Sequence, residues 1–443
     1  MSTVSNQLAA FIHGTTIDGL RPDIVELAKT RVLDAIATAL TSRGLPVPAP
    51  KLATAFVRGN TGSSTVIGSR SRVPAIDAAL VNATLINGSS LDDFLEKSHP
   101  AAVVVPAAMA VAEEQDASGA DFLVSVVAGY ELVGRAYMGA PGMLPRFRAT
   151  GVAGAIGAAA AAGKAFKLGE AALMSALGYA AMFASGFGEG FHAGTMEVKF
   201  NVGWAARSGV SAARLAYLGG TASPSVFEGK SGFFRAFGGN VDHVAAATQG
   251  LGERFLISDT IYKEYPVCIF VQTLMYLAGD LVKRHKLDAA QITRVSVLAP
   301  KDTFENPGFQ NVAPYANPLQ AHTSASFCTA AALLGKPVAE HAFYHKTTDP
   351  EVLALAAKVE LLPPSGDKER VVVSVVCGGK TYEIEAPQMD MLRPTTNKVV
   401  EKFRRLAEPS LGRATDEVLD VVMGLDRIRH IGELTHLLQL DND

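Results

Sequence analysis

Two neighbouring segments consist almost entirely of small and aliphatic residues, and they constrain the fold more than any other feature of the chain. Ala, Gly, Leu and Met dominate Gly151–Phe166 and Glu170–Ser185, and charged side chains are almost absent from both. Helices with so many small residues can approach one another closely, and their lack of charge indicates that neighbours cover them on both sides. We therefore expect the two segments to be packed helices inside a helical core.

The apolar character of the chain raises the question of a membrane protein. Hydrophobic residues make up 48% of the chain, and the mean hydropathy is +0.20. A membrane helix needs about 18 consecutive apolar residues, whereas the richest stretch, 151–163, is mainly Ala and Gly and ends at Lys164. The N-terminal residues lack a basic leader followed by an apolar run, so we expect no secretion signal.

The cysteine and charge patterns exclude further classes. Cys268, Cys328 and Cys377 lie far apart, and no histidine is spaced to share a metal with them, which favours reduced thiols over disulfides or a zinc site. Lys and Arg number 40 against 43 Asp and Glu, whereas nucleic-acid binders usually carry a strongly basic face. We expect a cytoplasmic protein with no metal and no nucleic-acid or membrane partner, although a balanced total does not exclude a local basic pocket.

Apolar spacing predicts further helices through most of the chain. The predicted segments are Pro22–Arg43, Asp77–Ile86, Pro106–Glu114, Ala120–Arg135, Asn201–Leu218, Ala321–Leu334, Pro350–Val359, Lys398–Ala407, Ala414–Met423 and His430–Leu440. After about residue 264 the helical spacing is joined by runs rich in β-branched residues and by an alternating segment. Strands are predicted there at Val295–Leu298, Val371–Val376 and Lys380–Glu385. The Gly378-Gly379 pair between the last two is typical of a hairpin turn.

These segments predict a mainly α protein in which a large helical-bundle domain is interrupted by a smaller α+β domain. A chain of 443 residues is long enough for two or three domains. We place the all-α helical domain at residues 1–264 plus 396–443, so that the C-terminal helices return to it. The α+β domain is placed at residues 265–395.

The first candidate site lies in the segment Asp92–Pro100, where acids and one histidine are close together. Histidine titrates near neutrality and a carboxylate partner can orient its ring, so His99 with Asp92 or Asp93 suits acid–base chemistry. Alternatively, the acids cap the next helix and His99 is an ordinary surface residue.

A second candidate is the basic loop that contains Arg146 and Arg148 and leads into the helix expected from Gly151. Backbone N–H groups at a helix start and two guanidinium groups could together bind a carboxylate or a phosphate. No strand precedes the Gly-x-x-Gly spacing, so it favours helix packing over a dinucleotide site. The alternative is that both arginines are solvated.

Lys199 and Lys263 complete the candidate residues. Lys199 opens an apolar helix after Gly194-Thr195, and a desolvated lysine there could act as a base or as an anion ligand. Lys263 and Tyr265 lie at the predicted boundary between the helical domain and the α+β domain. Ligand pockets often form at such domain junctions. Ordinary snorkelling or surface lysines are the alternative interpretation at both positions.

Together these stretches resemble the MmgE/PrpD family over most of the chain. The motifs that carry the resemblance are Leu80-x-Asn82-x-x-x-x-Asn87-Gly88, Asp92 to His99-Pro100, Val104-x-Pro106-Ala107, Ala128-Gly129-Tyr130-Glu131 with Arg135, Thr150-Gly151-x-x-Gly154, Gly194-Thr195-x-x-x-Lys199, Lys263-x-Tyr265-Pro266-x-Cys268, Asp349-Pro350-x-Val352 and Lys402-Phe403. The resemblance implies a helical-bundle domain plus an α+β lid, a homodimer, no cofactor and a small polycarboxylate as substrate.

The resemblance also implies an assignment of site residues. Asp92 or Asp93, His99, Lys199 and Lys263 fall where the family keeps active-site residues. We take Asp92, Asp93, His99 and Lys199 as candidate catalytic residues, and Arg146, Arg148, Lys263, Tyr265, Gln272 and Ser324 as candidate substrate contacts.

Three positions depart from the pattern of the family's lyases. Arg148 and Gln272 stand where those enzymes usually have histidines, and Phe327, three residues after Ser324, stands where they have a tyrosine. Dehydration needs an acid to help the hydroxyl leave, whereas epimerisation needs only a base and an acid on opposite faces of one carbon. We therefore expect an isomerase that abstracts the proton α to a carboxylate, an epimerase of the iminodisuccinate kind. The alternatives are a lyase of the 2-methylcitrate or aconitate kind and an inactive carboxylate-binding protein on the same fold.

Overall fold

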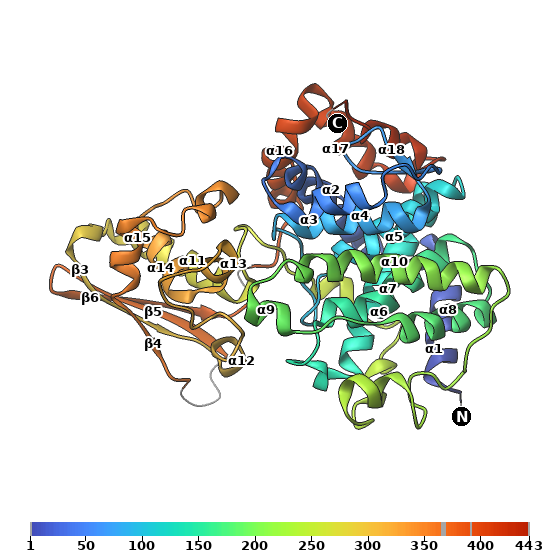
Figure 1. Cartoon of the computed structure of the whole chain (residues 1–443), viewed down its shortest axis with the longest axis horizontal. Helices are drawn as coiled ribbons and strands as arrows, with labels where there is room; N and C mark the ends of the chain where they lie inside the picture. The colour runs from blue at the N-terminus through green and yellow to red at the C-terminus, as the bar shows by residue number, and fades with distance from the viewer. Residues whose placement is uncertain (1, 365–368, 390–391, 442–443) are drawn as a thin grey trace. The chain divides into compact units, whose positions relative to one another are not determined.

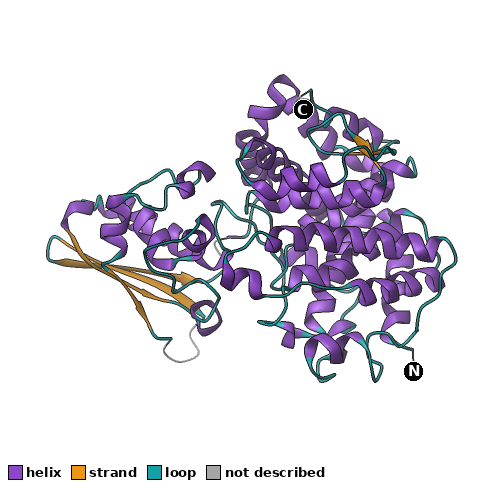
Figure 2. Ribbon diagram, in the orientation of Figure 1, coloured by secondary structure: helices purple, strands orange, loops and turns teal. Residues whose placement is uncertain are grey.

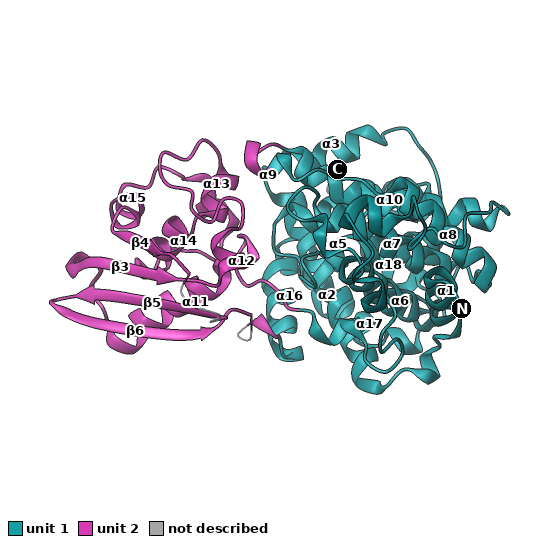
Figure 3. Ribbon diagram, turned by 90° about the horizontal axis from the view of Figure 1, so that it is seen from below, with its two compact units in different colours: residues 1–190, 196–260, 394–443 teal, residues 191–195, 261–393 magenta. Residues whose placement is uncertain are grey.

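The protein divides into two units in a computed structural model that describes residues 2–364, 369–389 and 392–441. Unit 1 comprises Met1–Gly190, Met196–Thr260 and Pro394–Asp443, and unit 2 comprises Phe191–Thr195 and Ile261–Arg393 (Figure 3). These limits differ by a few residues from the boundaries expected at 264/265 and 395/396. Helices dominate, and strands are concentrated in the smaller unit, so the expected mainly α fold class is confirmed (Figure 2).

Unit 1 is a bundle of helices in which the last three follow the excursion of the chain into unit 2. Its helices are α1 (Val4–Gly14), α2 (Pro22–Gly44), α3 (Pro48–Phe56), α4 (Ala75–Gly88), α5 (Pro100–Glu114), α6 (Gly119–Met138), α7 (Ala149–Ala165), α8 (Glu170–Phe183), α10 (Glu197–Tyr217), α16 (Thr396–Leu411), α17 (Thr415–Met423) and α18 (Gly432–Leu437) (Figure 1). Two short strands, β1 (Ser64–Thr65) and β2 (Arg72–Val73), pair antiparallel. The short α9 (Glu189–Ala193) spans the first unit boundary.

Helix α7 lies at the centre of unit 1, where it packs against α5, α6, α8 and α10. Every residue of α7 except Lys164 is buried, which confirms the expectation for this segment. A Cβ atom on Gly157 would lie 2.7 Å from the carbonyl oxygen of Gly129 in α6, and one on Gly209 would lie 2.6 Å from the backbone nitrogen of Ala159. Small residues therefore set the distance between these helices, because any side chain would push them apart.

Helix α8 does not follow the same expectation. It packs against α1, α7 and α10, but only half of its fourteen residues are buried, and Met182 is 66% exposed. The predicted burial on both sides is therefore wrong for α8. Alanine and glycine carry little apolar surface, so a segment rich in them can face water at small cost without any charged residue.

The helices that flank the candidate segment differ from their predicted limits. Helix α4 continues through Asn87 and Gly88, two residues beyond the predicted end at Ile86. Helix α5 starts at Pro100 and contains Pro106, which the sequence suggested as its beginning. Proline is well suited to a first helical position because its missing N–H has no partner there. The segment from Ser89 to His99 is the loop between these two helices, and we call it the site loop.

Unit 2 consists of a four-stranded sheet with helices. Its helices are α11 (Ile269–His285), α12 (Lys301–Phe304), α13 (Pro318–Thr323), α14 (Ala325–Leu333) and α15 (Pro350–Ala356), and its strands are β3 (Ile292–Leu298), β4 (Val359–Leu362), β5 (Arg370–Cys377) and β6 (Lys380–Pro387). The strand order is β4-β3-β5-β6, with β3 and β4 parallel and the other pairs antiparallel. Helix α11 packs against β5 and β6.

The β5–β6 hairpin is confirmed. Cys377 pairs with Lys380, and Gly378 and Gly379 have φ values of 56° and 76°. A two-residue hairpin turn requires positive φ at both positions, and glycine adopts it without a steric penalty. Helix α11 and strand β4 were not predicted. Val359, taken as the end of a helix, instead begins β4 and pairs with Val295 of β3.

Within the described ranges, none of the helices has the length and apolar character needed to cross a membrane.

Candidate active site

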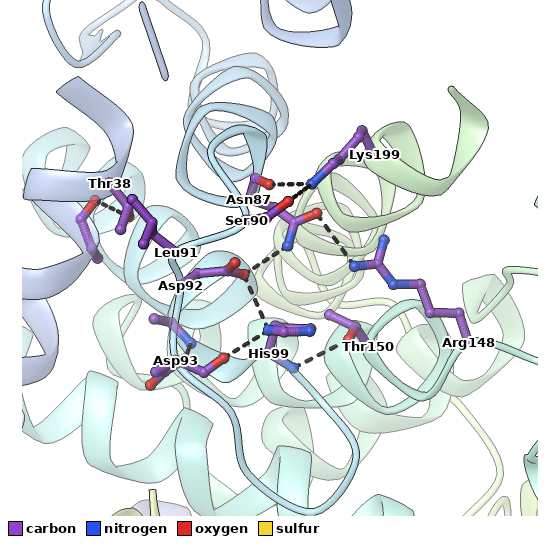
Figure 4. Close-up of polar contacts among 12 residues, drawn as sticks. Thr38, Asn87, Ser90, Leu91, Asp92, Asp93, His99, Arg148, Thr150 and Lys199 are labelled. Atoms are coloured by element: carbon purple, nitrogen blue, oxygen red, sulfur yellow. Dashed lines mark hydrogen bonds and ion pairs between the residues drawn. The ribbon is translucent and has the colours of Figure 1, made fainter. Parts of the chain in front are cut away.

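Four helix ends of unit 1 meet around the site loop (Figure 4). Asn87 lies in the last turn of α4, His99 is the N-cap of α5, Arg148 is the N-cap of α7, and Lys199 lies in the first turn of α10. Helix N-termini carry partial positive charge, so three of these four ends favour a bound anion. The sequence-predicted residues His99, Arg148 and Lys199 are thus brought together by the fold.

The ring of His99 is oriented by two acceptors. Its Nδ1 lies 2.7 Å from the backbone oxygen of Asp93 and 3.3 Å from Oδ2 of Asp92. Both oxygens only accept, so the neutral ring carries its proton on Nδ1 and its lone pair on Nε2. The side chain of His99 is 15% exposed, so it is not the surface residue of the alternative interpretation. Nε2 is therefore the atom suited to exchange a proton with a ligand.

The two adjacent aspartates have different partners, although both are fully buried. Oδ2 of Asp92 accepts a hydrogen bond from Nδ2 of Asn87 at 2.7 Å and faces His99. The carboxyl of Asp93 accepts from the backbone nitrogen of Ala101 at 2.9 Å and from the hydroxyl of Tyr130 at 2.7 Å. Asp92 is therefore the side chain that faces the histidine, and Asp93 contributes only its main chain to it.

Burial changes the acidity of the Asp93–Tyr130 pair. Desolvation raises the pKa of Asp93 to about 7, although the hydrogen bond from Tyr130 and the charge of Arg31 act in the opposite direction. The pKa of Tyr130 is raised well above its usual value, first by burial and then by Asp93. A carboxyl in this environment is partly protonated near neutral pH.

The site loop is held in a sparsely populated backbone conformation. Ser90, Glu96 and Lys97 have φ values of 59°, 46° and 63°, so three of the six described non-glycine residues with positive φ lie in this one loop. Each such residue costs about 1–2 kcal/mol. Strain of this kind persists where surrounding contacts determine the conformation, and it is common in functional loops.

Lys199 is held against the same loop. Its Nζ donates to the backbone oxygen of Asn87 and to Oγ of Ser90, each at 2.7 Å. Both acceptors are neutral oxygens, one before and one after Gly88-Ser89. The ammonium group therefore links the C-terminal end of α4 to the site loop by two hydrogen bonds. Lys199 is half-buried rather than fully solvated.

Arg148 is buried, and two of its nitrogens donate to neutral acceptors of the protein. Nη1 donates to the backbone oxygen of Val198, and Nη2 donates to Oδ1 of Asn87 at 3.3 Å. Desolvation lowers the pKa of Arg148 to about 10, partly offset by the charge of Asp92, so the group remains a cation at neutral pH. Arg148 therefore links the start of α10 to the end of α4 by hydrogen bonds. This structural role is separate from the substrate contact that was predicted for it.

Arg146 does not join these residues through its hydrogen bonds. Its side chain is exposed, and Nη2 donates to the backbone oxygens of Gly142 and Phe237, both at 3.1 Å. The guanidinium also lies 5.7 Å from the ring centre of Phe147. Arg146 instead links the segments that carry Gly142 and Phe237, and its part in binding one anion together with Arg148 stays a prediction.

The remaining predicted residues belong to unit 2 and are described within it. Lys263 is buried and Tyr265 half-buried. Gln272 is fully buried, and its Oε1 accepts from the backbone nitrogens of Glu264 at 3.3 Å and Tyr265 at 3.2 Å, while Nε2 donates to the backbone oxygen of Tyr265 at 2.7 Å. Gln272 thus fixes the backbone that carries Lys263 and Tyr265.

A phenol that the sequence analysis missed lies beside Ser324. The hydroxyl of Tyr315 is 3.1 Å from Oγ of Ser324, and its ring is 5.3 Å from that of Phe327. Ser324 also caps α14 by accepting from the backbone nitrogen of Phe327 at 3.1 Å. Burial raises the pKa of Tyr315. The apparent loss of a tyrosine at position 327 is thus accompanied by a tyrosine from another segment.

Asn87, Thr150 and Tyr130 are the other residues that the sequence analysis did not select. Thr150 accepts from the backbone nitrogen of His99 at 3.1 Å. All three occur in the motifs that carry the family resemblance, and this was their only signal in the sequence. Apart from Asp92, which is five residues from Asn87, their partners are 37 to 112 residues away. Among the described residues, no group of three or more His, Cys, Asp or Glu side chains is arranged to hold a metal ion.

Two family domains match the chain in succession. The MmgE/PrpD N-terminal domain matches residues 6–244, and the MmgE/PrpD C-terminal domain matches residues 265–425. Similar curated proteins match over nearly their whole length. The cis-aconitate decarboxylase of Aspergillus terreus (strain NIH 2624 / FGSC A1156) is 26% identical over 481 residues, which cover 99% of this chain and 96% of that protein.

Two further relatives extend the same pattern. The cis-aconitate decarboxylase of Homo sapiens is 25% identical, with 99% of this chain and 95% of that protein covered. The cis-aconitate decarboxylase-like protein oryM of Aspergillus oryzae is 27% identical, with 98% and 97% covered. Decarboxylases are lyases, so these relatives support the lyase alternative and not the epimerase that the sequence analysis favoured.

Proposed function

Because the chain belongs to the MmgE/PrpD family, we propose that it is a lyase that acts on a small polycarboxylate, with decarboxylation of the cis-aconitate kind as its reaction. The relatives named above support the reaction class, since they match this chain from end to end. Dehydration of the 2-methylcitrate kind is the second lyase reaction, and it would use the same acid–base groups.

The connection between His99 and Lys199 is the observation that carries the proposal. Lys199 bonds to the main chain of Asn87, the Asn87 side chain bonds to Asp92, and Asp92 faces Nδ1 of His99. Two proton-transfer groups are therefore fixed relative to each other, and the cations Lys199 and Arg148 with three helix N-termini favour a polyanionic substrate.

The proposed step needs one proton and stabilisation of negative charge. The bond between carbon and the departing carboxylate breaks, and carbon dioxide leaves without the bonding electron pair. That pair moves through the neighbouring double bond toward a conjugated carboxylate, which nearby cations stabilise. A proton from His99 or Lys199 then adds to the double-bond carbon next to that conjugated carboxylate, so that atoms and charge balance.

The substitutions that favoured an epimerase have a structural explanation in this proposal. Arg148 bonds to the backbone of Val198 next to Lys199, Gln272 bonds to the backbone of Glu264 next to Lys263, and Tyr315 supplies a phenol near Phe327. Missing imidazoles at two positions thus do not by themselves argue against a lyase. Roles for Lys263 and Tyr265 in substrate binding, a homodimer and a cytoplasmic location stay predictions.

Product analysis in deuterated buffer tests the reaction type. The full chain is incubated with cis-aconitate and with related tricarboxylates and hydroxytricarboxylates, and products are followed by NMR together with carbon dioxide release. We expect carbon dioxide and an unsaturated dicarboxylate that carries one deuterium. Exchange at a carbon next to a carboxylate without loss of carbon dioxide or water would identify an epimerase, and no turnover of any compound would favour a binding protein.

Two substitutions test the residues. His99→Gln and Lys199→Ala should each lower kcat about 10²–10⁴-fold, the usual contribution of a general acid or base. Lys164→Ala is the matched control, because Nζ of Lys164 also bonds a backbone oxygen, that of His13 at 2.8 Å. It lies at the other end of α7, about 24 Å along the helix from Arg148, and should leave kcat unchanged. Equal losses in Lys199→Ala and Lys164→Ala would contradict the assigned site.

A further inference from the structure

Asn87 makes hydrogen bonds to three of the residues around the site loop (Figure 4). It is 2% exposed, so it is enclosed by the protein. Its Oδ1 accepts from Nη2 of Arg148 at 3.3 Å, its Nδ2 donates to Oδ2 of Asp92 at 2.7 Å, and its backbone oxygen accepts from Nζ of Lys199 at 2.7 Å. One residue thereby connects two cations and one carboxylate.

The amide group is chemically suited to this position. It places a donor and an acceptor on one rigid plane, so it can separate a guanidinium from a carboxylate while it satisfies both. An aspartate of the same shape could only accept and would face Asp92 as a second carboxylate. An alanine would satisfy neither partner and would leave Arg148 and Asp92 without this buried neighbour.

Asp92 transmits this arrangement to the histidine. Its Oδ2 is shared between Nδ2 of Asn87 and Nδ1 of His99 at 3.3 Å. A carboxylate oxygen that accepts a hydrogen bond from an amide is less available to a second donor. The strength of the Asp92–His99 contact therefore depends on Asn87, although Asn87 makes no described hydrogen bond to the His99 ring.

We propose that Asn87 is a positioning residue that fixes His99 and Lys199 relative to each other by holding Asp92 on one side and Arg148 on the other. The inference rests on the proposed function, since it assigns Asn87 to the same acid–base site. Arg148 acts in this arrangement through Asn87 and the start of α10.

Asn82 provides a matched control on the same helix. It is fully buried, its Oδ1 accepts from the backbone nitrogen of Ile67 at 2.9 Å, and its Nδ2 donates to the backbone oxygen of Thr65 at 2.9 Å. Asn82→Ala and Asn87→Ala each remove one buried amide with a donor bond and an acceptor bond. Both should lower Tm, so a loss of stability alone does not separate them.

The first readout separates kcat from KM. Asn87→Ala should lower kcat about 10–100-fold while KM changes less than about threefold, because small displacements of proton-transfer groups are costly and Asn87 itself does not bind substrate in this proposal. Asn82→Ala should leave both constants unchanged at a temperature where both variants are folded. Equal kcat values for the two variants, or a loss in Asn87→Ala confined to KM, would overturn the inference.

The second readout does not require turnover. NMR of ¹⁵N-histidine-labelled protein follows the pH at which the His99 ring titrates, assigned with His99→Gln. Within unit 1, Asp92 and the main chain of Asp93 contact the ring, Tyr130 bonds to Asp93, and Arg148 and Lys199 bond to Asn87, which bonds to Asp92. In Asn87→Ala, Asp92 loses its amide donor and attracts the protonated ring more strongly, so the titration should move upward by roughly half to one pH unit.

The two readouts also separate this inference from the proposed function. A titration that moves in Asn87→Ala and not in Asn82→Ala supports the positioning role even where the wild type turns over no polycarboxylate, a result that would remove the lyase proposal alone. A titration that is identical in the wild type and Asn87→Ala would overturn the positioning role even where the lyase activity is found.

Discussion

At the scale of single residues, Asp92 and Asp93 illustrate how neighbours determine the role of a carboxyl group. They are adjacent, identical in type and equally buried, yet one faces Asn87 and His99 while the other faces Tyr130 and a backbone nitrogen. The sequence analysis left open which of them serves His99. The choice depends on the direction in which the site loop turns each side chain, and Ser90, Glu96 and Lys97 of that loop have positive φ values.

The raised pKa of Asp93 predicts a pH dependence of stability. Its pKa is 3.8 in an unfolded chain and about 7 in the folded protein. Between these values the folded state binds more protons, so this group makes the free energy of unfolding fall as pH rises from about 4 to 7, after which its contribution is constant. Each pKa unit corresponds to about 1.4 kcal/mol, so the free energy of unfolding should fall by about 4 kcal/mol in all over this pH range.

Asp93→Asn should remove that dependence. The amide keeps an acceptor for Ala101 but disturbs the bond from Tyr130, so the variant should be somewhat less stable than the wild type at pH 5 and more stable at pH 8. Thermal unfolding at the two pH values measures the difference. Asp23→Asn is the control, since Arg21 lowers the pKa of that exposed carboxyl and its titration lies below this range. The same Tm difference between pH 5 and 8 in the wild type and Asp93→Asn would contradict the prediction.

At the scale of elements, the close packing of α7 against α6 and α10 fixes the site geometry. Arg148 and Thr150 sit at the start of α7, so any shift of this helix moves both. The glycines that permit this contact distance are Gly157 and Gly129, whose backbones face each other. The small residues that first indicated a closely packed helix are therefore required for the helix spacing of α7.

Gly157→Ala should test this spacing. Its Cβ would lie 2.7 Å from the Gly129 oxygen and would also collide with the Val133 side chain, so we expect a loss of about 1–3 kcal/mol in the free energy of unfolding. Gly279 in the interior of α11 is the control, because nothing lies within 4 Å of its added Cβ. Gly279→Ala should gain about 1 kcal/mol from helix propensity. Urea unfolding of both variants gives the values, and a gain at both positions would disprove the spacing argument.

The elements that could be predicted from the sequence are those whose pattern is local. The apolar period of α2 and the paired glycines of the β5–β6 hairpin needed no distant partner. Strand β4 was missed because Val359 also fits the spacing of the preceding helix, and only its pairing with β3 decides. Helix α11 begins with Ile269-Phe270-Val271, a run that equally suits a strand, and its helical state depends on packing against β5 and β6.

The same distinction applies to the candidate site. His99 and Lys199 were selected because their chemistry is visible in the residue type. Asn87 was not selected, since an asparagine gains its role from partners, and here Arg148 and Lys199 are 61 and 112 positions away. Arg146 was expected beside Arg148 because the two are close in sequence, but the loop turns them toward different neighbours.

At the scale of the whole molecule, the C-terminal helices complete a unit that the chain left before residue 261. Helix α16 packs against α2, and Lys402 lies at their contact. Its Nζ is 2.7 Å from Oδ1 of Asp34 and 2.8 Å from the backbone oxygen of Leu91 in the site loop. Both side chains of this ion pair are almost completely buried. The last part of the chain thereby supports the loop that carries Asp92.

Lys402→Met should lower the free energy of unfolding by about 3–5 kcal/mol, because it leaves the Asp34 carboxylate buried without its cation. Replacing both partners, with Asp34→Leu and Lys402→Met together, should cost less than Lys402→Met alone, since no unpaired charge remains. A double-mutant cycle from denaturant unfolding measures the coupling. Additive losses in the double variant would show that the ion pair contributes nothing of its own.

The discontinuous path of unit 1 also has a consequence for synthesis. Residues 261–393 leave the ribosome before the helix that covers α2, a delay on the order of ten seconds at usual rates of translation. During that time the apolar face of α2 and the carboxylate of Asp34 have no partner from α16. A nascent chain halted before residue 394 should therefore bind chaperones through this face, and it should be cut by proteases at sites that the finished protein conceals.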